Sequence, residues 1–327
     1  MKYLKILLLI SITLGITMLS GCVFHPDRAF DPHAVVTVNT DQSIIMHDTA
    51  AFAQNLAVIT PEETLVGGFD ATGIGTALLV DDTDAQTIVS YGGDQKIYPA
   101  SMTKVMSGIL IAEALENGTL NMDQVVTVSQ NIVLEAGAAK LNLMSGDQIT
   151  VKNLVYGYLV RSLNDCGIVL AQQIAGSEAA FVELMNQKAQ MLGATHTHFV
   201  NCHGLHNDDH YTTAYDLYLF FREFASHELV HEIDQITKYD LSYTNAAGEP
   251  VMLTIESTNG FLAGTYPLPS KYQIGAWKSG TTKAAGFCLI MQVQYQEHSY
   301  FAVICKADDR DMLYQKMAQL VQCIPEE

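Results

Sequence analysis

Residues 98–104 read Tyr98-Pro99-Ala100-Ser101-Met102-Thr103-Lys104 and stand directly before a long apolar run. A serine and a lysine three residues apart at the start of a helix lie on one face, about one turn apart. The amine of Lys104 can then take the proton of the Ser101 hydroxyl, and a serine is a weak nucleophile until a neighbouring base activates it. The spacing is common by chance, so this pair alone does not establish a catalytic site.

Two further motifs make the first one specific. Ser162-Leu163-Asn164 begins 61 residues after Ser101, and Lys278-Ser279-Gly280 begins 116 residues after Ser162. Three such motifs in this order are the signature of penicillin-recognising serine acyl enzymes. A helix cap, a polar kink and an ordinary strand lysine would explain the three motifs one at a time. They would not explain why all three occur in this order.

The apolar patterns around the motifs predict strands near both ends of the chain and helices between them. Hairpins are expected over residues 77–91 and 286–306. Helices are expected over residues 101–116, 151–175 with a break at 162–164, 178–192, 213–225 and 311–323. We therefore predict a two-lobed α+β fold, in which one antiparallel sheet is flanked by helices and a helical lobe is inserted. A site between sheet and lobe is expected.

The chain resembles the low-molecular-mass D-alanyl-D-alanine carboxypeptidases, which are penicillin-binding serine peptidases with the transpeptidase/β-lactamase-like fold. The resemblance covers roughly residues 70–315. It rests on residues 98–106, 160–165, 192–201, 203–205, 210–216 and 278–282. It implies a serine enzyme that removes the terminal D-alanine from peptidoglycan stem peptides and is also acylated by penicillins.

The resemblance assigns catalytic roles to three residues. Ser101 is the expected nucleophile, Lys104 is the base that takes its proton, and Ser162 passes a proton toward the leaving amine. Lys104 must be neutral to act as a base. Burial and the nearby cation Lys278 would both lower its pKa.

The resemblance also implies how the substrate is held. The expected substrate-binding residues are Asn164, Lys278, Ser279, Gly280 and Thr281. Asn164 would hold Lys104 or the substrate amide, and Lys278 would attract the terminal carboxylate, assisted by the hydroxyl of Ser279 or Thr281. The backbone N–H groups of Ser101 and Thr281 are the expected oxyanion hole.

Two departures from the family pattern stand out. Ser279 occupies a position where threonine is usual, but both residues supply a hydroxyl, so activity is expected to survive. Larger members carry a C-terminal β-rich domain and an amphipathic membrane helix. Neither is expected here, because only about ten residues follow the midpoint of the last predicted helix.

The first residues are expected to be a targeting segment. Lys2 and Lys5 precede an apolar run over residues 6–19, which is shorter than the roughly 20 residues of a membrane span. Small residues before Cys22 resemble a bacterial lipoprotein signal; the alternative is an ordinary secretory signal with an incidental cysteine. The expected organisation is a signal peptide at 1–21, lipid attachment and a tether at 22–70, and the catalytic domain at 71–327. Lipid on Cys22 would tether the protein to a membrane of the cell envelope.

The negative net charge of the chain argues against one class of partner. The net charge is −18, and near −20 without residues 1–21, which argues against nucleic-acid binding. The expected partners are stem peptides, β-lactams and the membrane.

Five histidines are crowded together, namely His196, His198, His203, His206 and His210. Their spacing fits no zinc motif, so no metal and no cofactor are expected.

Cys288 and Cys305 flank the turn at Gln296-Glu297 symmetrically. A tight hairpin there would place them opposite each other, so a cross-strand disulfide is conceivable outside the cytoplasm. Buried free thiols are the favoured interpretation.

Two other functions stay open. A β-lactamase would use the same nucleophile but needs fast deacylation, in one class by a glutamate that primes water. No glutamate is recognisably placed for that role, although Glu135 is a candidate. A non-hydrolytic lipoprotein that binds penicillin or wall peptides is the second alternative, and the intact motif residues argue against it.

Overall fold

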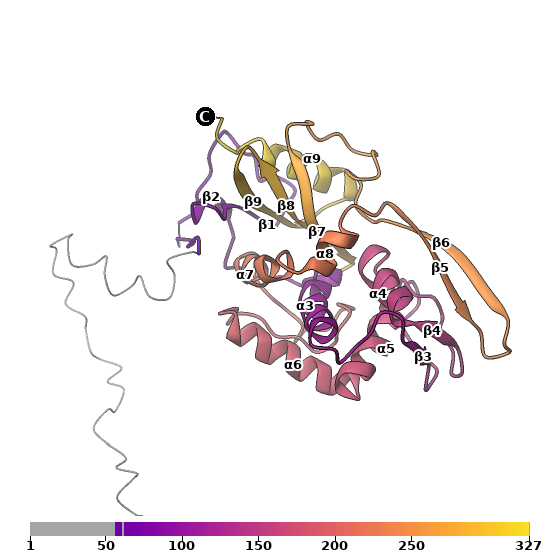
Figure 1. Ribbon diagram of the computed structural model, residues 1–327. Coiled ribbons are helices and arrows are strands. Elements are labelled where there is room, and N and C mark those ends of the chain that lie inside the picture. Colours follow the sequence, from indigo (N-terminus) through magenta and orange to yellow (C-terminus); the bar gives the residue numbers. More distant parts are fainter. Residues whose placement is uncertain (1–55, 61, 327) are drawn as a thin grey trace, which may run out of the picture. The chain divides into compact units, whose positions relative to one another are not determined.

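The computed structural model describes residues 56–60 and 62–326, and its centre is a five-stranded antiparallel sheet (Figure 1). The strand order is β2-β1-β9-β8-β7. The strands are β1 (Thr76–Asp81), β2 (Gln86–Tyr91), β7 (Gln273–Thr282), β8 (Gly286–Tyr295) and β9 (His298–Ala307). Since β1 pairs with both β2 and β9, distant parts of the chain build one sheet, as the sequence predicted.

Helices between these strands form the second lobe, which confirms the α+β prediction. They are α3 (Thr103–Glu116), preceded by a 3-10 turn (Ala100–Met102), α4 (Val151–Val160), α5 (Asn164–Ala175), α6 (Glu178–Met191), α7 (Ala214–Phe224) and α8 (Glu228–Ile233), with α9 (Arg310–Val321) after the sheet. The predicted break at 162–164 separates α4 from α5. Ser177 caps α6, because its Oγ accepts a hydrogen bond from Ala180 N–H at 3.1 Å.

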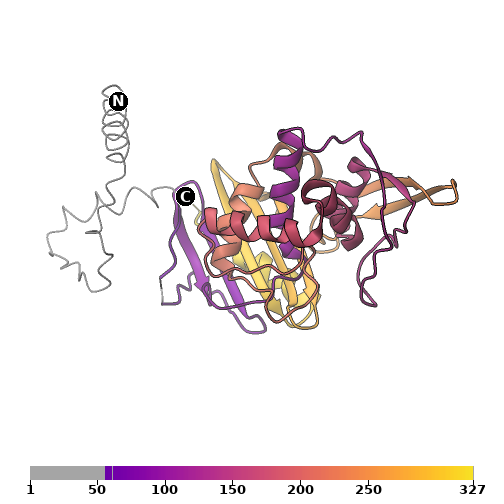
Figure 2. The same ribbon diagram turned by 90° about the horizontal axis from the view of Figure 1, so that it is seen from below.

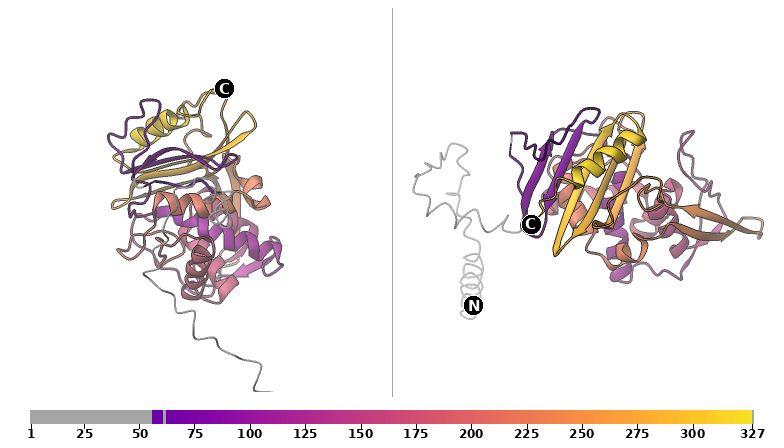
Figure 3. Two further views of the ribbon diagram at one scale, coloured as in Figure 1. Left: turned by 90° about the vertical axis from the view of Figure 1, so that its left-hand side faces the viewer. Right: turned by 90° about the horizontal axis from the view of Figure 1, so that it is seen from above.

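Alternation along β1 divides the core into two parts. Leu78 and Val80 belong to the core shared with α3 and α7, whereas Ala77 and Leu79 belong to the core under α9. Figure 3 shows α9 on one face of the sheet and the helical lobe on the other. The sheet is therefore buried on both faces, and β7 forms one of its edges.

A second antiparallel sheet, which the sequence analysis did not predict, has the order β3-β4-β5-β6. Its strands are β3 (Val125–Thr127), β4 (Gln148–Thr150), β5 (Lys238–Thr244) and β6 (Pro250–Glu256). The β5–β6 hairpin projects away from the helices (Figures 1 and 2). Most of its side chains are partly or fully exposed, so its strands carry only a weak apolar signal.

The predicted signal peptide, residues 1–21, and Cys22 lie outside the described residues. The described part of the predicted tether packs on the body: Thr64 and Ser90 exchange two backbone hydrogen bonds of 2.8 Å, and Phe69 is buried. Among the described residues no single helix is long and apolar enough to cross a membrane. Helices α5 and α6 satisfy that test only as a pair bent by 82°.

The cysteines in the described part of the chain are free thiols, in agreement with the favoured interpretation. Cys166, Cys202, Cys288 and Cys305 are buried, and Cys323 is partly exposed. Cys288 Sγ accepts a hydrogen bond from the backbone N–H of Lys306 at 3.4 Å.

Candidate active site

Ser101 and Lys104 meet where the 3-10 turn passes into α3. Ser101 lies in the turn and Lys104 in the first turn of the helix, and Lys104 Nζ is 3.1 Å from Ser101 Oγ. Ala100 just before them has a left-handed φ of 48°, an unfavourable value for a residue with a side chain. Strain of this kind costs about 1–3 kcal/mol and persists only where the surroundings enforce it.

Lys104 Nζ lies within hydrogen-bond distance of two carbonyl oxygens besides Ser101. It donates to Asn164 Oδ1 at 2.6 Å and to the main-chain oxygen of His203 at 2.7 Å. A carbonyl oxygen can only accept, so a neutral amine gives its two hydrogens to these oxygens. Its lone pair then faces the Ser101 hydroxyl, which is the arrangement that a base requires.

Burial and charge favour this neutral form. Burial is the larger cause that holds the pKa of Lys104 well below 10.5, and the positive charge of Lys278 lowers it further. Burial alone lowers the pKa of Lys278 to about 7. Because the two amines repel each other when both are charged, they do not readily carry a proton at the same time.

Ser162 and Asn164 lie at the break between α4 and α5. Ser162 has a left-handed φ of 67°. Its Oγ is buried and has no hydrogen-bond partner among residues 56–60 and 62–326. A buried hydroxyl without a partner costs about 1–3 kcal/mol. Both observations suit a group that interacts with a ligand.

The third motif lies on edge strand β7, against the nucleophile turn. A Cβ on Gly280 would lie 2.8 Å from Ser101 N and 3.0 Å from Pro99 O, so only glycine fits there. Lys278 Nζ is buried and donates to Ser279 O at 2.9 Å. Ser279 Oγ shares a 2.7 Å hydrogen bond with Thr258 Oγ1, and Thr281 is exposed.

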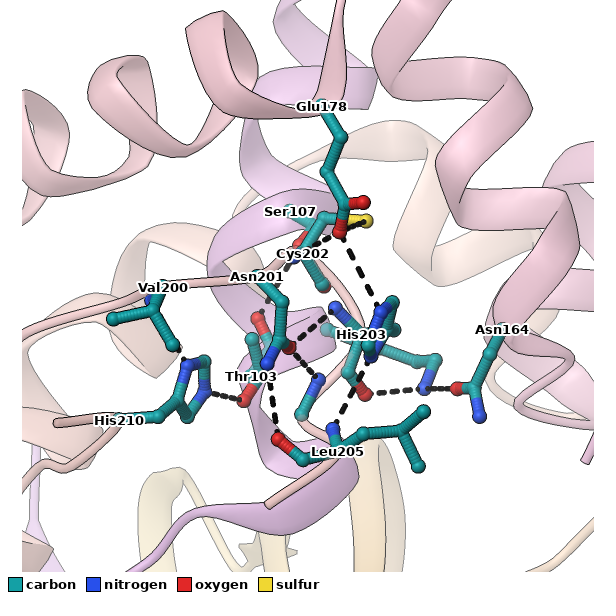
Figure 4. Close-up of polar contacts among 12 residues, drawn as sticks. Thr103, Ser107, Asn164, Glu178, Val200, Asn201, Cys202, His203, Leu205 and His210 are labelled. Atoms are coloured by element: carbon teal, nitrogen blue, oxygen red, sulfur yellow. Dashed lines mark hydrogen bonds and ion pairs between the residues drawn. The ribbon is translucent and has the colours of Figure 1, made fainter. Parts of the chain in front are cut away.

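The turn over residues 201–205, shown in Figure 4, supplies the His203 carbonyl oxygen that accepts from Lys104, and the sequence analysis assigned this turn no role. His203 Nδ1 accepts from Leu205 N–H at 3.2 Å, so the ring hydrogen is on Nε2, which lies 3.5 Å from Glu178 Oε1. Burial lowers the pKa of His203 to about 3, which keeps the ring neutral. Gly204 has a φ of 87°, and a Cβ there would collide with Ala100 O. The glycine after His203 was the available sequence signal.

His210 links Val200, just before this turn, to Thr103 at the start of α3. Its Nδ1 accepts from Val200 N–H at 3.0 Å, so its Nε2 donates to Thr103 Oγ1 at 2.7 Å, and Thr103 Oγ1 donates to Ala100 O at 2.8 Å. Burial lowers the pKa of His210 to about 3. Both ring nitrogens of His203 and of His210 therefore have protein partners. The two neutral rings have a structural role.

A family model described as D-alanyl-D-alanine carboxypeptidase matches residues 69–309 and so contains all three motifs. The chain belongs to the D-alanyl-D-alanine carboxypeptidase family. It is 30% identical to the D-alanyl-D-alanine carboxypeptidase DacF of Bacillus subtilis over 70% of this chain and 56% of that protein. It is also 30% identical to DacD of Escherichia coli over 72% of this chain and 58% of that protein. The matches thus span little more than half the length of these relatives.

Two solved structures of penicillin-binding proteins are similar in fold to this chain. Penicillin binding protein 6B of Escherichia coli matches with a TM-score of 0.67 at 27% identity, over 81% of this chain and 78% of that protein. Penicillin-binding protein D2 of Listeria monocytogenes, solved in a cefotaxime-bound form, matches with a TM-score of 0.64 at 23% identity, over 77% of this chain and 96% of that one. The second likeness concerns the fold only.

Proposed function

We propose that this chain is a serine-type D-Ala-D-Ala carboxypeptidase that removes the terminal D-alanine from peptidoglycan stem peptides. The observation that carries the proposal is the contact between Ser101 Oγ and the buried Lys104 amine, which also lies within hydrogen-bond distance of two carbonyl oxygens. Membership of the D-alanyl-D-alanine carboxypeptidase family supports the choice of substrate.

In the proposed reaction Ser101 Oγ attacks the carbonyl carbon of the D-Ala-D-Ala bond while Lys104 Nζ takes the hydroxyl proton. The charge on the carbonyl oxygen is stabilised by the backbone N–H groups of Ser101 and Thr281; close packing of Gly280 on Ser101 N supports this arrangement. Ser162 passes a proton to the amine that leaves as D-alanine. Water then hydrolyses the ester on Ser101, with Lys104 again as the base.

Recognition of the substrate is assigned to the opposite wall of the site. Charged Lys278 binds the terminal carboxylate, assisted by the hydroxyls of Ser279 and Thr281. Asn164 holds Lys104 through its Oδ1, which leaves its amide nitrogen for the substrate. Penicillins would acylate Ser101 by the same attack, and the ester would hydrolyse slowly.

The proposed location follows from the N-terminal residues of the sequence. Residues 1–21 are proposed to be a lipoprotein signal peptide, Cys22 the lipidated residue, and residues 22–70 the segment that joins the lipid to a catalytic domain at 71–327. The enzyme would then act on the wall from a membrane of the cell envelope. Metabolic labelling with a radioactive fatty acid tests this: label is expected on the wild type and not on Cys22→Ala.

Two measurements on the detergent-solubilised full chain test the activity. D-alanine released from an acetylated D-Ala-D-Ala peptide is quantified, and the lifetime of the adduct with a fluorescent penicillin is followed. The proposal predicts D-alanine release together with a long-lived adduct. Rapid penicillin turnover without D-alanine release would indicate a β-lactamase, and a stable adduct without release would indicate a non-hydrolytic binder.

A further inference from the structure

Glu178, the first residue of α6, connects this helix to the turn at residues 201–205 (Figure 4). Its Oε1 accepts from the backbone N–H of Cys202 at 3.2 Å and lies 3.5 Å from Nε2 of His203. That Nε2 carries the ring hydrogen, because Nδ1 accepts from Leu205 N–H. One carboxylate oxygen therefore holds both the backbone and a side chain at the centre of the turn.

The peptide groups of this turn have fixed orientations. Asn201 Oδ1 accepts from His203 N–H at 3.2 Å and from Gly204 N–H at 2.6 Å. In a planar trans peptide the N–H and the C=O point in opposite directions, so the peptide group between His203 and Gly204 directs its oxygen away from Asn201. That oxygen accepts from Lys104 Nζ at 2.7 Å. The position of an acceptor for Lys104 therefore depends on how the turn is held.

The preceding residue, Cys202, is bound through both its carbonyl and its N–H. Its oxygen accepts from Tyr158 Oη at 2.6 Å and from Ser107 Oγ at 2.7 Å, while its N–H donates to Glu178. Without the Glu178 oxygen, the Cys202 N–H and the His203 ring lose their shared acceptor. Because an unpaired buried donor is costly, the turn is then expected to shift toward another partner, and the His203 oxygen with it.

We propose that Glu178 is a positioning residue for the base, which keeps the His203 oxygen in place as a hydrogen-bond acceptor for Lys104. It does so by holding the Cys202 N–H and the His203 ring. The acceptor oxygen of Glu178 is the part that acts, and its charge is not required. This inference rests on the proposed function, since it concerns Lys104 as the base that activates Ser101.

The pH dependence of acylation reports on this acceptor. Lys104 must be neutral to act as a base, so its protonation produces the acid limb of the profile. Hydrogen bonds stabilise a charged amine more than a neutral one, so loss of the His203 acceptor lowers the pKa of Lys104 and moves the acid limb to lower pH.

The other titratable groups around Lys104 come from α4, α5, the turn, the segment after it and β7, and are Tyr158, Cys166, Cys202, His203, His210 and Lys278. Burial raises the pKa of the tyrosine and of both thiols, and it lowers the pKa of each histidine to about 3. All of these groups except Lys278 are therefore neutral near pH 7.

The test compares Glu178→Ala with Glu178→Gln. Both variants remove the same negative charge from the first turn of α6, but glutamine keeps an oxygen that can accept. Because the Glu178 side chain is 30% exposed, both are expected to fold. Glu183→Ala, at an exposed position on the same helix, is the control. The rate of acylation by a fluorescent penicillin is measured against pH on the detergent-solubilised full chain.

We expect Glu178→Ala to be acylated about tenfold more slowly at its optimum pH, with its acid limb at lower pH than in the wild type. Glu178→Gln and Glu183→Ala should keep the wild-type limb. An unmoved limb in Glu178→Ala would overturn the inference whatever its rate, because a packing defect alone slows the enzyme without changing the pKa of Lys104. A limb that moves as far in Glu178→Gln would also overturn it, since the charge would then be the part that acts.

Failure of the proposed function has a different signature. If the wild type formed no penicillin adduct and released no D-alanine, that function would fail. The pKa of Lys104 is then measured directly by NMR on the full chain with isotopically labelled lysine, and its signal is assigned by its absence from Lys104→Met. A lower pKa in Glu178→Ala than in the wild type and Glu178→Gln is expected, and equal values would overturn the inference.

Discussion

The two walls of the active site differ in how far their polar groups are satisfied. On the wall made by α3 and residues 201–205, Lys104 Nζ has two carbonyl acceptors besides Ser101, and His203 and His210 use both ring nitrogens. On the wall made by the Ser162 break and β7, the buried Ser162 Oγ has no partner among the described residues. On that second wall Lys278 and Ser279 do have partners, so Ser162 alone is left for the substrate to satisfy in the proposed reaction.

The largest effect is expected when Lys104, the proposed base, is replaced. Lys104→Met keeps an unbranched buried side chain but removes the lone pair, so acylation of Ser101 by a fluorescent penicillin is expected to slow by about 10²–10⁴. Lys152→Met, at an exposed position on α4, is the matched control and should acylate at the wild-type rate. Wild-type acylation by a folded Lys104→Met protein would show that another group is the base.

The next largest effect is expected where Gly280 of β7 packs against the backbone of Ser101. In Gly280→Ala the new Cβ meets Ser101 N at 2.8 Å, so the backbone N–H groups at Ser101 and Thr281 must move apart. A misplaced oxyanion donor costs about 10²–10³ in rate, and kcat for D-alanine release should fall by that amount. Lys283→Ala, an exposed substitution just beyond β7, serves as the control. An unchanged kcat in Gly280→Ala would show that β7 does not contribute to the oxyanion hole.

The pH profile distinguishes the two lysines. In the proposed mechanism Lys278 binds the substrate carboxylate only when it is charged. Its pKa is about 7, so kcat/KM of the free enzyme should fall as the pH rises through about 7. The acid limb is expected from Lys104, which must be neutral to act as the base and whose pKa is held well below 10.5 by burial and by the charge of Lys278. Lys278→Arg keeps its charge at every accessible pH and is expected to lose the alkaline limb, even if its overall rate is lower. A limb at the same pH in that variant would assign it to another group.

The same buried lysine affects stability in a definite direction. The pKa of Lys278 is about 7 in the folded chain and 10.5 for the model side chain, so the unfolded chain binds more protons between these values. The free energy of unfolding contributed by Lys278 therefore rises with pH across that window.

The smallest effect is expected at Ser162, whose buried hydroxyl has no partner among the described residues. Ser162→Gly removes a buried hydroxyl without a partner and relieves the φ of 67°, so the free energy of unfolding should increase by about 1–2 kcal/mol while D-alanine release falls. Ser162→Ala separates the two contributions, because it removes the hydroxyl but keeps the strained backbone. Urea unfolding supplies the measurement. A destabilised Ser162→Gly would mean that the hydroxyl is stabilising in the folded protein.

Sequence reasoning succeeded where chemistry depends on side-chain identity. Ser101, Lys104 and Asn164 could be found because their types and spacings are diagnostic, and the structure brings them together. The His203 carbonyl that accepts from Lys104 could not be found, because a backbone oxygen leaves no mark on residue type. The β5–β6 hairpin was missed for another reason: its exposed strands have little apolar periodicity, and their position depends on distant partners such as Gln148, which pairs with Thr244.

The most direct test of the central claim is to map the penicillin adduct by mass spectrometry after proteolysis of the labelled full chain. The account predicts one modified residue, Ser101, and no adduct in Ser101→Ala. An adduct on another residue, or labelling that persists in Ser101→Ala, would contradict the assignment of Ser101 as the nucleophile activated by Lys104.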